Sequence, residues 1–339
     1  MTDSAMRTTG FTNKGEAQNI LKDSVKEGKW FEYIDSNGNP TSDIHAPYYS
    51  LTFYRGGRPF GMVRTYYRSG KIQGEIPYFK GKISGNYRRY FESGKIYAEI
   101  PYINGKENGI AKLYYESGGI LKEAPCTNDK INGVVKIYYE DGKLNQENTY
   151  MNGMVTGVVK VYYESGALMS EAPFTNGKRN GMYRWYYEDG KLQGEVNYKD
   201  SLEEGPAKEY YESGTLMKNV FCVNGQKTGI GKEYYESGKI KGQCPYVNDL
   251  KNGVDSIYNE NGKISGIIPY KDDSINGIEK LFYIDGALDL EIPYISDEKE
   301  GVEKEYYENG KLESETPYED DEISGAIKFY DEDGNLIKN

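Results

Sequence analysis

Hydrophobic and polar positions along this chain repeat with a fixed spacing of 24 residues. One series of glycines begins at Gly61 and a second at Gly70, and each recurs in steps of 24 through twelve repeats. When the first glycine is numbered position 1, position 12 is Ile or Leu in all twelve repeats and position 6 is Tyr in eleven. A sustained period of this length predicts a repeat protein in which each repeat packs mainly on its neighbours.

Each repeat predicts two β-strands. Positions 2–7 are rich in Val, Ile and Tyr, which favour a half-buried pleated strand. Positions 8–11 read mostly E-S-G-K or E-D-G-K, and the glycine favours a tight turn with a left-handed residue. Positions 12–16 form the return strand, and Pro at position 17 in eight of eleven repeats interrupts the regular ladder. Asn-Gly or Asn-Asp near positions 20 and 21 turns the chain into the next hairpin.

Charged residues predict the register of the hairpin. Position 4 is Lys or Arg in eleven of twelve repeats, and position 15 is Glu in eight of eleven. The tight turn places these positions roughly opposite each other, as in Lys112 with Glu123 and Lys160 with Glu171. Each such pair contributes about 0.2–1 kcal/mol. A slip of one residue would break the whole row, so the pairs help to fix the register.

These elements predict the fold class and the domain organisation. We expect an all-β protein, an elongated single-layer antiparallel sheet of stacked 24-residue hairpins in which each repeat advances about 9.5 Å. Residues 1–27 are a polar N-terminal segment in which Ala17–Lys26 could form a short helix. Residues 28–60 form a degenerate capping repeat. Eleven complete repeats cover residues 61–324, and residues 325–339 form a partial C-terminal repeat.

The repeated motifs Y-Y-E-S-G-K-L and P-Y-x-N-G-K-x-x-G resemble those of the variant class of MORN repeats. The resemblance covers about residues 28–339. It extends to a bacterial branch often described as the YwqK-family antitoxins of toxin–antitoxin systems. It implies an elongated sheet of stacked hairpins that contacts other proteins and, in some members, lipids.

Composition narrows the classes of partner. The net charge is −11, which disfavours nucleic acids and anionic membranes as partners. The chain has no stretch approaching 18 apolar residues and no apolar signal sequence at its start, so we expect a cytoplasmic protein. Three cysteines without a CxxC motif indicate free thiols rather than a disulfide framework.

Charge is distributed unevenly along the array. Residues 61–108 contain nine basic and four acidic residues, whereas residues 253–339 contain eight basic and twenty-three acidic residues. Opposite charges at the two ends give the chain a polarity that can select partners. The acidic end favours a basic protein partner, or the basic end of a second copy in an antiparallel homodimer.

Candidate chemistry is sparse. The one histidine, His45, lies beside Asp43 in an apparent loop and has no partners that suggest a metal or acid–base site. Carboxylates recur at positions 8 and 15, which indicates turn and ladder roles. Acidic runs such as Glu319–Glu322 lack the spaced oxygen ligands of a calcium loop. We therefore expect no enzymatic activity, no catalytic residues, no cofactor and no metal.

The tyrosine rows provide the candidate site. Positions 6 and 7 point to opposite faces of the strand. Position 7 is expected to share its face with the Ile or Leu of position 12 and to form the core, while position 6 shares a face with the charged positions 4 and 15. Tyrosine supplies large contact area at low entropic cost. The candidate partner-binding face is the position-6 row of Tyr114, Tyr138, Tyr162, Tyr186, Tyr210 and Tyr234.

The function that these features predict is a non-enzymatic protein–protein interaction scaffold with an extended aromatic and charged face. One alternative is an antitoxin-like inhibitor that binds and neutralises a partner toxin. Another is a glycan-binding or lipid-binding repeat protein, because aromatic hairpins can also cage choline or stack on sugars. Such cell-wall binders are usually rich in Trp and exported, whereas this chain contains only Trp30 and Trp185.

Overall fold

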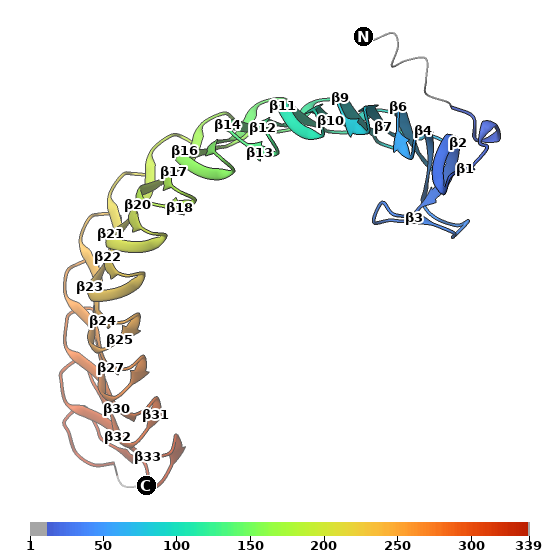
Figure 1. The fold of residues 1–339 in the computed structure, drawn as a ribbon. Coiled ribbons are helices and arrows are strands. Elements are labelled where there is room, and N and C mark those ends of the chain that lie inside the picture. Colours follow the sequence, from blue (N-terminus) through green and yellow to red (C-terminus); the bar gives the residue numbers. More distant parts are fainter. Residues whose placement is uncertain (1–11, 338–339) are drawn as a thin grey trace. The chain divides into compact units, whose positions relative to one another are not determined.

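The computed structural model describes residues 12–337, which are built almost entirely of antiparallel β-strands (Figure 1). The helical structure in this range is one 3-10 turn, η1 (Lys14–Glu16). The chain divides into two compact halves. The N-terminal half comprises Met1–Ala167 with Phe174–Gly177, and the C-terminal half comprises Leu168–Pro173 with Lys178–Asn339.

The strands follow the 24-residue period. Those of the N-terminal half are β1 (Ile20–Lys22), β2 (Val25–Ile34), β3 (Pro40–Thr41), β4 (Tyr48–Arg55), β5 (Arg58–Pro59), β6 (Gly61–Tyr67), β7 (Ile72–Phe79), β8 (Lys82–Ile83), β9 (Gly85–Tyr90), β10 (Ile96–Ile103), β11 (Lys106–Tyr114), β12 (Ile120–Thr127), β13 (Lys130–Ile131), β14 (Gly133–Tyr138), β15 (Leu144–Met151) and β16 (Met154–Tyr162). Strand β17 (Leu168–Thr175) contributes to both halves. Those of the C-terminal half are β18 (Lys178–Arg179), β19 (Gly181–Tyr186), β20 (Leu192–Lys199), β21 (Leu202–Tyr210), β22 (Leu216–Val223), β23 (Gln226–Tyr234), β24 (Ile240–Val247), β25 (Leu250–Lys251), β26 (Gly253–Tyr258), β27 (Ile264–Lys271), β28 (Ser274–Ile275), β29 (Gly277–Phe282), β30 (Leu288–Ile295), β31 (Glu298–Lys299), β32 (Gly301–Tyr306), β33 (Leu312–Glu319), β34 (Glu322–Ile323) and β35 (Lys328–Phe329).

The two long strands of each repeat form the predicted hairpin. Strands β11 and β12 pair Lys112 directly with Glu123, and the Lys112 Nζ lies 3.1 Å from a Glu123 carboxylate oxygen. The predicted register of positions 4 and 15 is therefore confirmed within this repeat. At the tight turn, Gly118 has φ +107° and its N–H donates to the Tyr115 carbonyl at 2.9 Å. The expected left-handed glycine is thus present at position 10.

The glycine at position 1 packs against the proline at position 17 of the preceding repeat. Gly109 has φ +126°, and a Cβ added to it would lie 2.8 Å from Pro101 Cγ. Both the backbone conformation and the close approach therefore exclude a larger residue. The same contact joins Gly85 to Pro77, Gly133 to Pro125, Gly181 to Pro173, Gly253 to Pro245, Gly277 to Pro269 and Gly301 to Pro293.

The connector between hairpins turns at positions 20 and 21. Asn104 and Gly105 both have positive φ, +53° and +85°, as the favoured two-residue hairpin turns require. In other repeats an aspartate replaces this glycine, and its side chain then binds the preceding repeat. For example, the Glu107 N–H donates to Asp129 Oδ1 at 2.7 Å. The substitution thus adds a hydrogen bond between repeats.

A β-bulge at position 13 decides which residues share a face. Leu113 pairs with Lys122, but the next residue, Tyr114, pairs with Ile120 across the bulge. Position 12 therefore lies opposite position 6, and the prediction that it shares a face with position 7 is wrong. We call the side that carries positions 2, 4, 6, 15 and 17 the outer face. The side that carries positions 3, 5, 14, 16 and 18 is the inner face.

The inner face holds most of the buried residues of the repeats. Ala98 is 1% exposed and Val135 is 2% exposed. Other buried apolar residues on this face are Val63, Ala124, Cys126, Ala172, Val196, Val220, Cys222, Cys244 and Ile292. The connectors pack on the same side: in the C-terminal half, β25 and β31 lie on one side of the long strands (Figure 1). In several repeats position 14 is Gly or Ala, as at Gly74 and Ala98, which leaves room for this covering layer.

The three cysteines belong to this inner layer. Cys126, Cys222 and Cys244 are buried free thiols. Burial raises the pKa of the Cys222 and Cys244 thiols to about 11. A protonated buried thiol is a poor nucleophile, so these side chains act as small packing residues.

The N-terminal region differs from the prediction. Ala17–Lys26 contains β1 and the start of β2 rather than a helix, and Ile20 pairs with Glu27 in that hairpin. Leu51 of β4 is 1% exposed and forms a buried cluster with Tyr66. Partly buried Ala17, Phe31, Tyr49 and Ile72 pack around the cluster. Residues 1–11 of the predicted polar segment and 338–339 of the last repeat lie outside the described residues.

Candidate functional site

The predicted position-6 tyrosines are half-buried on the outer face, and most of their hydroxyls reach back to the preceding repeat. The Tyr114 hydroxyl donates to Glu99 Oε2 at 3.0 Å. Equivalent bonds join Tyr138 to Glu123 at 3.1 Å, Tyr186 to Glu171 at 3.0 Å and Tyr210 to Glu195 at 3.4 Å. For Tyr162 and Tyr234, the backbone carbonyls accept bonds from the hydroxyls of Tyr139 and Tyr211.

The position-7 tyrosines reach in the other direction. The Tyr115 hydroxyl donates to the Tyr138 carbonyl of the following repeat at 2.7 Å. The same bond is made by Tyr67, Tyr139, Tyr187, Tyr211, Tyr235, Tyr283 and Tyr307 at 2.6–2.8 Å. Both tyrosine rows therefore join successive repeats. The rings of the position-6 row are half-buried on the outer face, while most of the row's hydroxyls already bond within the fold.

Carboxylates and cations alternate along the outer face. Glu99 pairs with Arg88 of its own hairpin and with Lys112 of the next. Arg88 Nε lies 2.9 Å from Glu99 Oε1, and this bond lowers the pKa of the Glu99 carboxyl. Burial, with the hydrogen bond to Glu75, raises the pKa of the Tyr90 hydroxyl to about 12. We call this alternating row of positions 4 and 15 the charge ladder. At neutral pH it consists of ionised glutamates that accept hydrogen bonds from cations and from protonated tyrosines.

This ladder predicts acid sensitivity. The carboxyls of Glu99, Glu123 and Glu291 have pKa values below the ordinary 4.5, with a hydrogen bond from a cation as the largest cause. Their contribution to stability is therefore present above about pH 4.5 and is lost as pH falls through the lower folded-state values. We expect Glu123→Gln to cost about 1 kcal/mol at neutral pH and to flatten the pH dependence of thermal unfolding.

The matched control is Glu116→Gln, which removes the same charge from an exposed turn. Thermal unfolding followed by circular dichroism between about pH 7 and about pH 3 compares the variants with the wild type. If Glu123→Gln and Glu116→Gln gave the same profile, the ladder would have no special role in stability.

Exposed aliphatic side chains run beside the charge ladder. Those at position 2 are 42–57% exposed: Ile110, Val134 and Val158 in the N-terminal half, and Ile230, Val254, Ile278 and Val302 in the C-terminal half. Those at position 19 are 36–58% exposed: Phe79, Ile103 and Met151 in the N-terminal half, and Val223, Val247 and Ile295 in the C-terminal half. We call these two rows the outer stripe.

The geometry of the hairpin brings the two rows together. Ile230 pairs with Pro245, and Val247 lies two residues beyond that proline on the same strand, so all three project to the same side. Exposed apolar side chains that lie side by side in this way are candidates for an interaction surface. The sequence prediction missed the outer stripe because Val or Ile beside a tyrosine-rich strand also fits a core position. The sequence feature that indicates the outer stripe is position 2, which is Ile, Val or Met in nine of twelve repeats.

The other candidates give no catalytic arrangement. His45 is exposed, and its Nδ1 lies 3.1 Å from a guanidinium nitrogen of Arg68. In the acidic runs, Asp297 and Asp321 use their Oδ1 atoms to accept backbone N–H groups at 2.6 Å. Over residues 12–337, no group of three or more His, Cys, Asp or Glu side chains is placed to hold a metal. In the same range, no helix has the length and apolar character needed to span a bilayer.

Comparison with known proteins identifies the repeats. The family model of the MORN repeat variant matches residues 61–80, 84–104, 107–128, 131–152, 155–176, 179–200, 203–221, 227–248, 251–272 and 299–320. No curated protein matches the chain.

Among solved structures, the chain is similar to "Crystal Structure of TcdB2-TccC3-TEV" at 12% identity and a TM-score of 0.17, over 91% of this chain and 17% of that one. It is also similar to "Crystal Structure of TcdB2-TccC3-Cdc42" at 11% identity and a TM-score of 0.16, over 86% and 20%. The chain thus spans a fifth or less of the length of these solved chains. Because the family model matches ten segments over more than half of its residues, the chain belongs to the MORN repeat variant family.

Proposed function

We propose that this chain is a non-enzymatic interaction protein that binds a protein partner across the outer face of several successive repeats. The observation that carries this proposal is the outer stripe, in which aliphatic side chains at positions 2 and 19 remain exposed in both halves. Membership in a repeat family supports it, because stacked repeats create extended binding surfaces rather than single pockets.

The composition of the outer face supports this proposal. The aliphatic rows would form the apolar centre, and the ladder of positions 4 and 15 would form a polar rim. The rings of Tyr114, Tyr138, Tyr162, Tyr186, Tyr210 and Tyr234 lie on the same face and would add aromatic contact area. Their hydroxyls are largely engaged with glutamates, so the tyrosines support the interface more than they define it.

Charge suggests the kind of partner. Residues 253–339 carry a large acidic excess, with twenty-three acidic and eight basic residues. A basic protein would be steered to this end, and its association would slow as salt screens the attraction. The basic residues 61–108 of a second copy offer the same complementarity, which corresponds to an antiparallel homodimer.

The antitoxin-like inhibitor is a special case of this proposal. In that case the partner would be a toxin whose activity falls when the outer face binds it. A glycan-binding or lipid-binding role would require a ligand other than protein. Binding to sugar polymers or to vesicles, in the absence of a protein partner, would favour that alternative.

The test uses the outer stripe directly. A triple variant, Ile230→Glu with Val254→Glu and Ile278→Glu, places charges on three neighbouring exposed sites. We expect partner binding to fall by about a hundredfold or more, because interface centres tolerate unpaired charge poorly. Binding partners are captured with the wild type, identified by mass spectrometry and then titrated against both proteins. The β-sheet circular dichroism should stay unchanged because the three sites are exposed.

The matched control places charges on exposed turns, with Ser213→Glu and Ser237→Glu. Wild-type affinity in the triple variant would contradict the proposal. Light scattering on the wild type tests the homodimer separately, since a concentration-dependent dimer that the triple variant cannot form would identify the partner as a second copy.

A further inference from the structure

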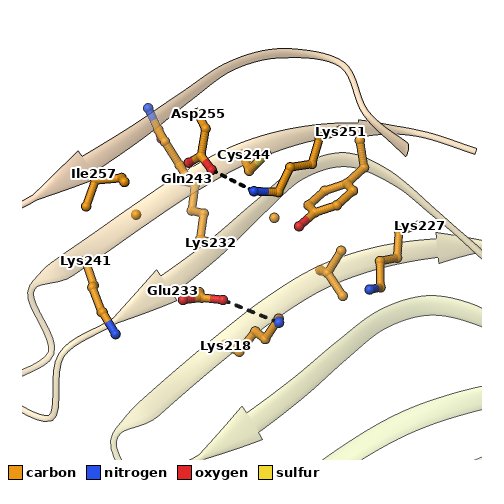
Figure 2. A pocket seen from close by; sticks show the side chains of 14 residues that line it. Lys218, Lys227, Lys232, Glu233, Lys241, Gln243, Cys244, Lys251, Asp255 and Ile257 are labelled. Carbon is orange, nitrogen blue, oxygen red and sulfur yellow. Dashed lines mark hydrogen bonds and ion pairs between the residues drawn. The ribbon is translucent and has the colours of Figure 1, made fainter. Parts of the chain in front are cut away.

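The inner face of the C-terminal half contains a pocket beside two inner-face positions that are occupied by glycine. Positions 3 and 14 are occupied by glycines, Gly231 and Gly242, and the pocket beside them has a volume of about 230 Å³. Its lining comes from strands β22 to β26, which belong to successive hairpins (Figure 2). A Cβ added to Gly231 would lie 2.9 Å from the Tyr246 ring, so this ring covers the glycine and forms part of the wall.

The pocket is basic in an acidic protein. Five lysines and two carboxylates border it, and without Lys232, whose position 4 faces the outer side, the excess is two positive charges, whereas the whole chain has a net charge of −11. Two of the lysines form ion pairs, Lys251 with Asp255 at 3.2 Å and Lys218 with Glu233 at 3.4 Å. The other three are Lys227, Lys232 and Lys241, and none of them has a carboxylate within ion-pair distance among the described residues.

The lack of a partner for Lys232 has a local cause. In most repeats the residue at position 15 is a glutamate that pairs with position 4, but here Lys232 lies between Asn219 and Gln243. The ladder therefore lacks its carboxylates next to the pocket. Because Lys232 stands at position 4, its side chain projects to the outer face and offers no ammonium group to a ligand in the pocket.

Two ammonium groups lie at opposite ends of the pocket. Figure 2 shows Lys241 at one end and Lys227 at the other, with the two ion pairs between them. Apolar lining residues are Val220, Cys244 and Ile257. A ligand that satisfies this arrangement has an anionic group at each end and an uncharged chain between them, because the lysines and carboxylates in the middle already pair with one another.

We propose that this pocket binds a short-chain dicarboxylate, with one carboxylate at Lys227, the other at Lys241 and the methylene chain over the apolar lining. The size agrees, because the volume lies below the roughly 300–1,000 Å³ of pockets for drug-sized ligands. Both terminal lysines are exposed, so each contact contributes modestly and the pair of contacts provides the selectivity. The Tyr246 hydroxyl stays protonated, since burial raises its pKa, and it can donate to a bound carboxylate.

The first test is calorimetric titration of the full chain with glutarate, with butyrate and inorganic phosphate as comparison ligands. Glutarate should bind saturably and at least about tenfold more tightly than butyrate, which has one carboxylate. Lys227→Ala and Lys241→Ala should each weaken glutarate binding by about threefold to fivefold and should reduce its advantage over butyrate. The control Lys271→Ala, an exposed lysine outside the pocket, should have no effect.

A pocket-filling variant gives an independent test. Gly242 has no positive φ, and an added Cβ would meet the Ser256 carbonyl oxygen at an ordinary 3.5 Å. Leucine already occupies the same position in another repeat, at Leu290. Gly242→Leu should therefore fold, as checked by circular dichroism, and should abolish glutarate binding.

Three results would overturn the proposal: equal binding of glutarate and butyrate, phosphate binding as tight as glutarate binding, or full glutarate affinity in both lysine variants. None of these results would bear on the proposed binding of a protein partner, because the outer stripe lies on the other face of the strands.

Discussion

Replacement of Val135 by Asp is expected to lower the free energy of unfolding of the N-terminal half by about 3–5 kcal/mol. Val135 lies at position 3 on the inner face, is 2% exposed and pairs with Asn148. The new carboxylate would be buried with no cation beside it, and an uncompensated buried charge is among the most destabilising single changes. Urea unfolding followed by circular dichroism, together with hydrogen exchange of residues 120–151, measures the loss.

The chain itself suggests how to restore stability. In the C-terminal half, a lysine at position 23 pairs with an acidic residue at position 3 of the next repeat, as Lys299 does with Glu303 at 2.6 Å. The equivalent position for Val135 is Ile131. Adding Ile131→Lys to Val135→Asp should recover about 1 kcal/mol or more. If Val135→Asp alone cost less than about 1 kcal/mol, the inner face would not be the packed one.

Replacement of Leu51 by Ala is expected to cost about 2–5 kcal/mol, because the substitution leaves a cavity in a packed cluster. Leu51 is 1% exposed, and together with Tyr66 it joins β4 to the first complete repeat. Repeat proteins lose stability locally, so the loss should be concentrated near this contact. Hydrogen exchange of β2, β4 and β6 should increase, while protection of the C-terminal half should stay near its wild-type value.

The control for this prediction is Ile103→Ala. Ile103 is 55% exposed, and its truncation should change stability by no more than about 0.5 kcal/mol. A comparable loss of stability in both variants would indicate that the buried contact between Leu51 and Tyr66 contributes no more than an exposed side chain does. An increase in exchange throughout the chain would contradict the expectation that stability is local.

The strand pattern could be predicted from the sequence because it depends on local chemistry that recurs in every repeat. The turn glycine, such as Gly118, and the opposed Lys112 and Glu123 follow from spacing and turn geometry alone. The assignment of faces could not be extended past position 13, because simple alternation fails where a β-bulge inserts one residue. Tyr114 therefore pairs with Ile120, and the expected partnership of positions 7 and 12 does not occur.

The site was harder to predict than the fold. Tyrosines were expected to be the binding surface, but the sequence does not show that the Tyr114 hydroxyl is already bound to Glu99. It also does not show that Ile110 is exposed, since aliphatic residues are equally compatible with a core. Likewise, the polar stretch near Ile20 is compatible with a helix until pairing with Glu27 is known. In each case a contact between separate segments decides the outcome.

The tyrosine bonds between repeats also bear on how such a gene can change in length. Most hydroxyls of the two rows find their acceptor in whichever repeat lies next to them, either a backbone carbonyl or a glutamate at position 15. Loss of residues 109–132 would bring Tyr138 to Glu99 in place of Tyr114, with the turn and the ladder unchanged. Duplication or deletion of DNA segments that encode 24 residues would therefore give foldable chains, whereas other lengths would misalign the bonds. The number of repeats is thus a property that replication slippage can alter in single steps.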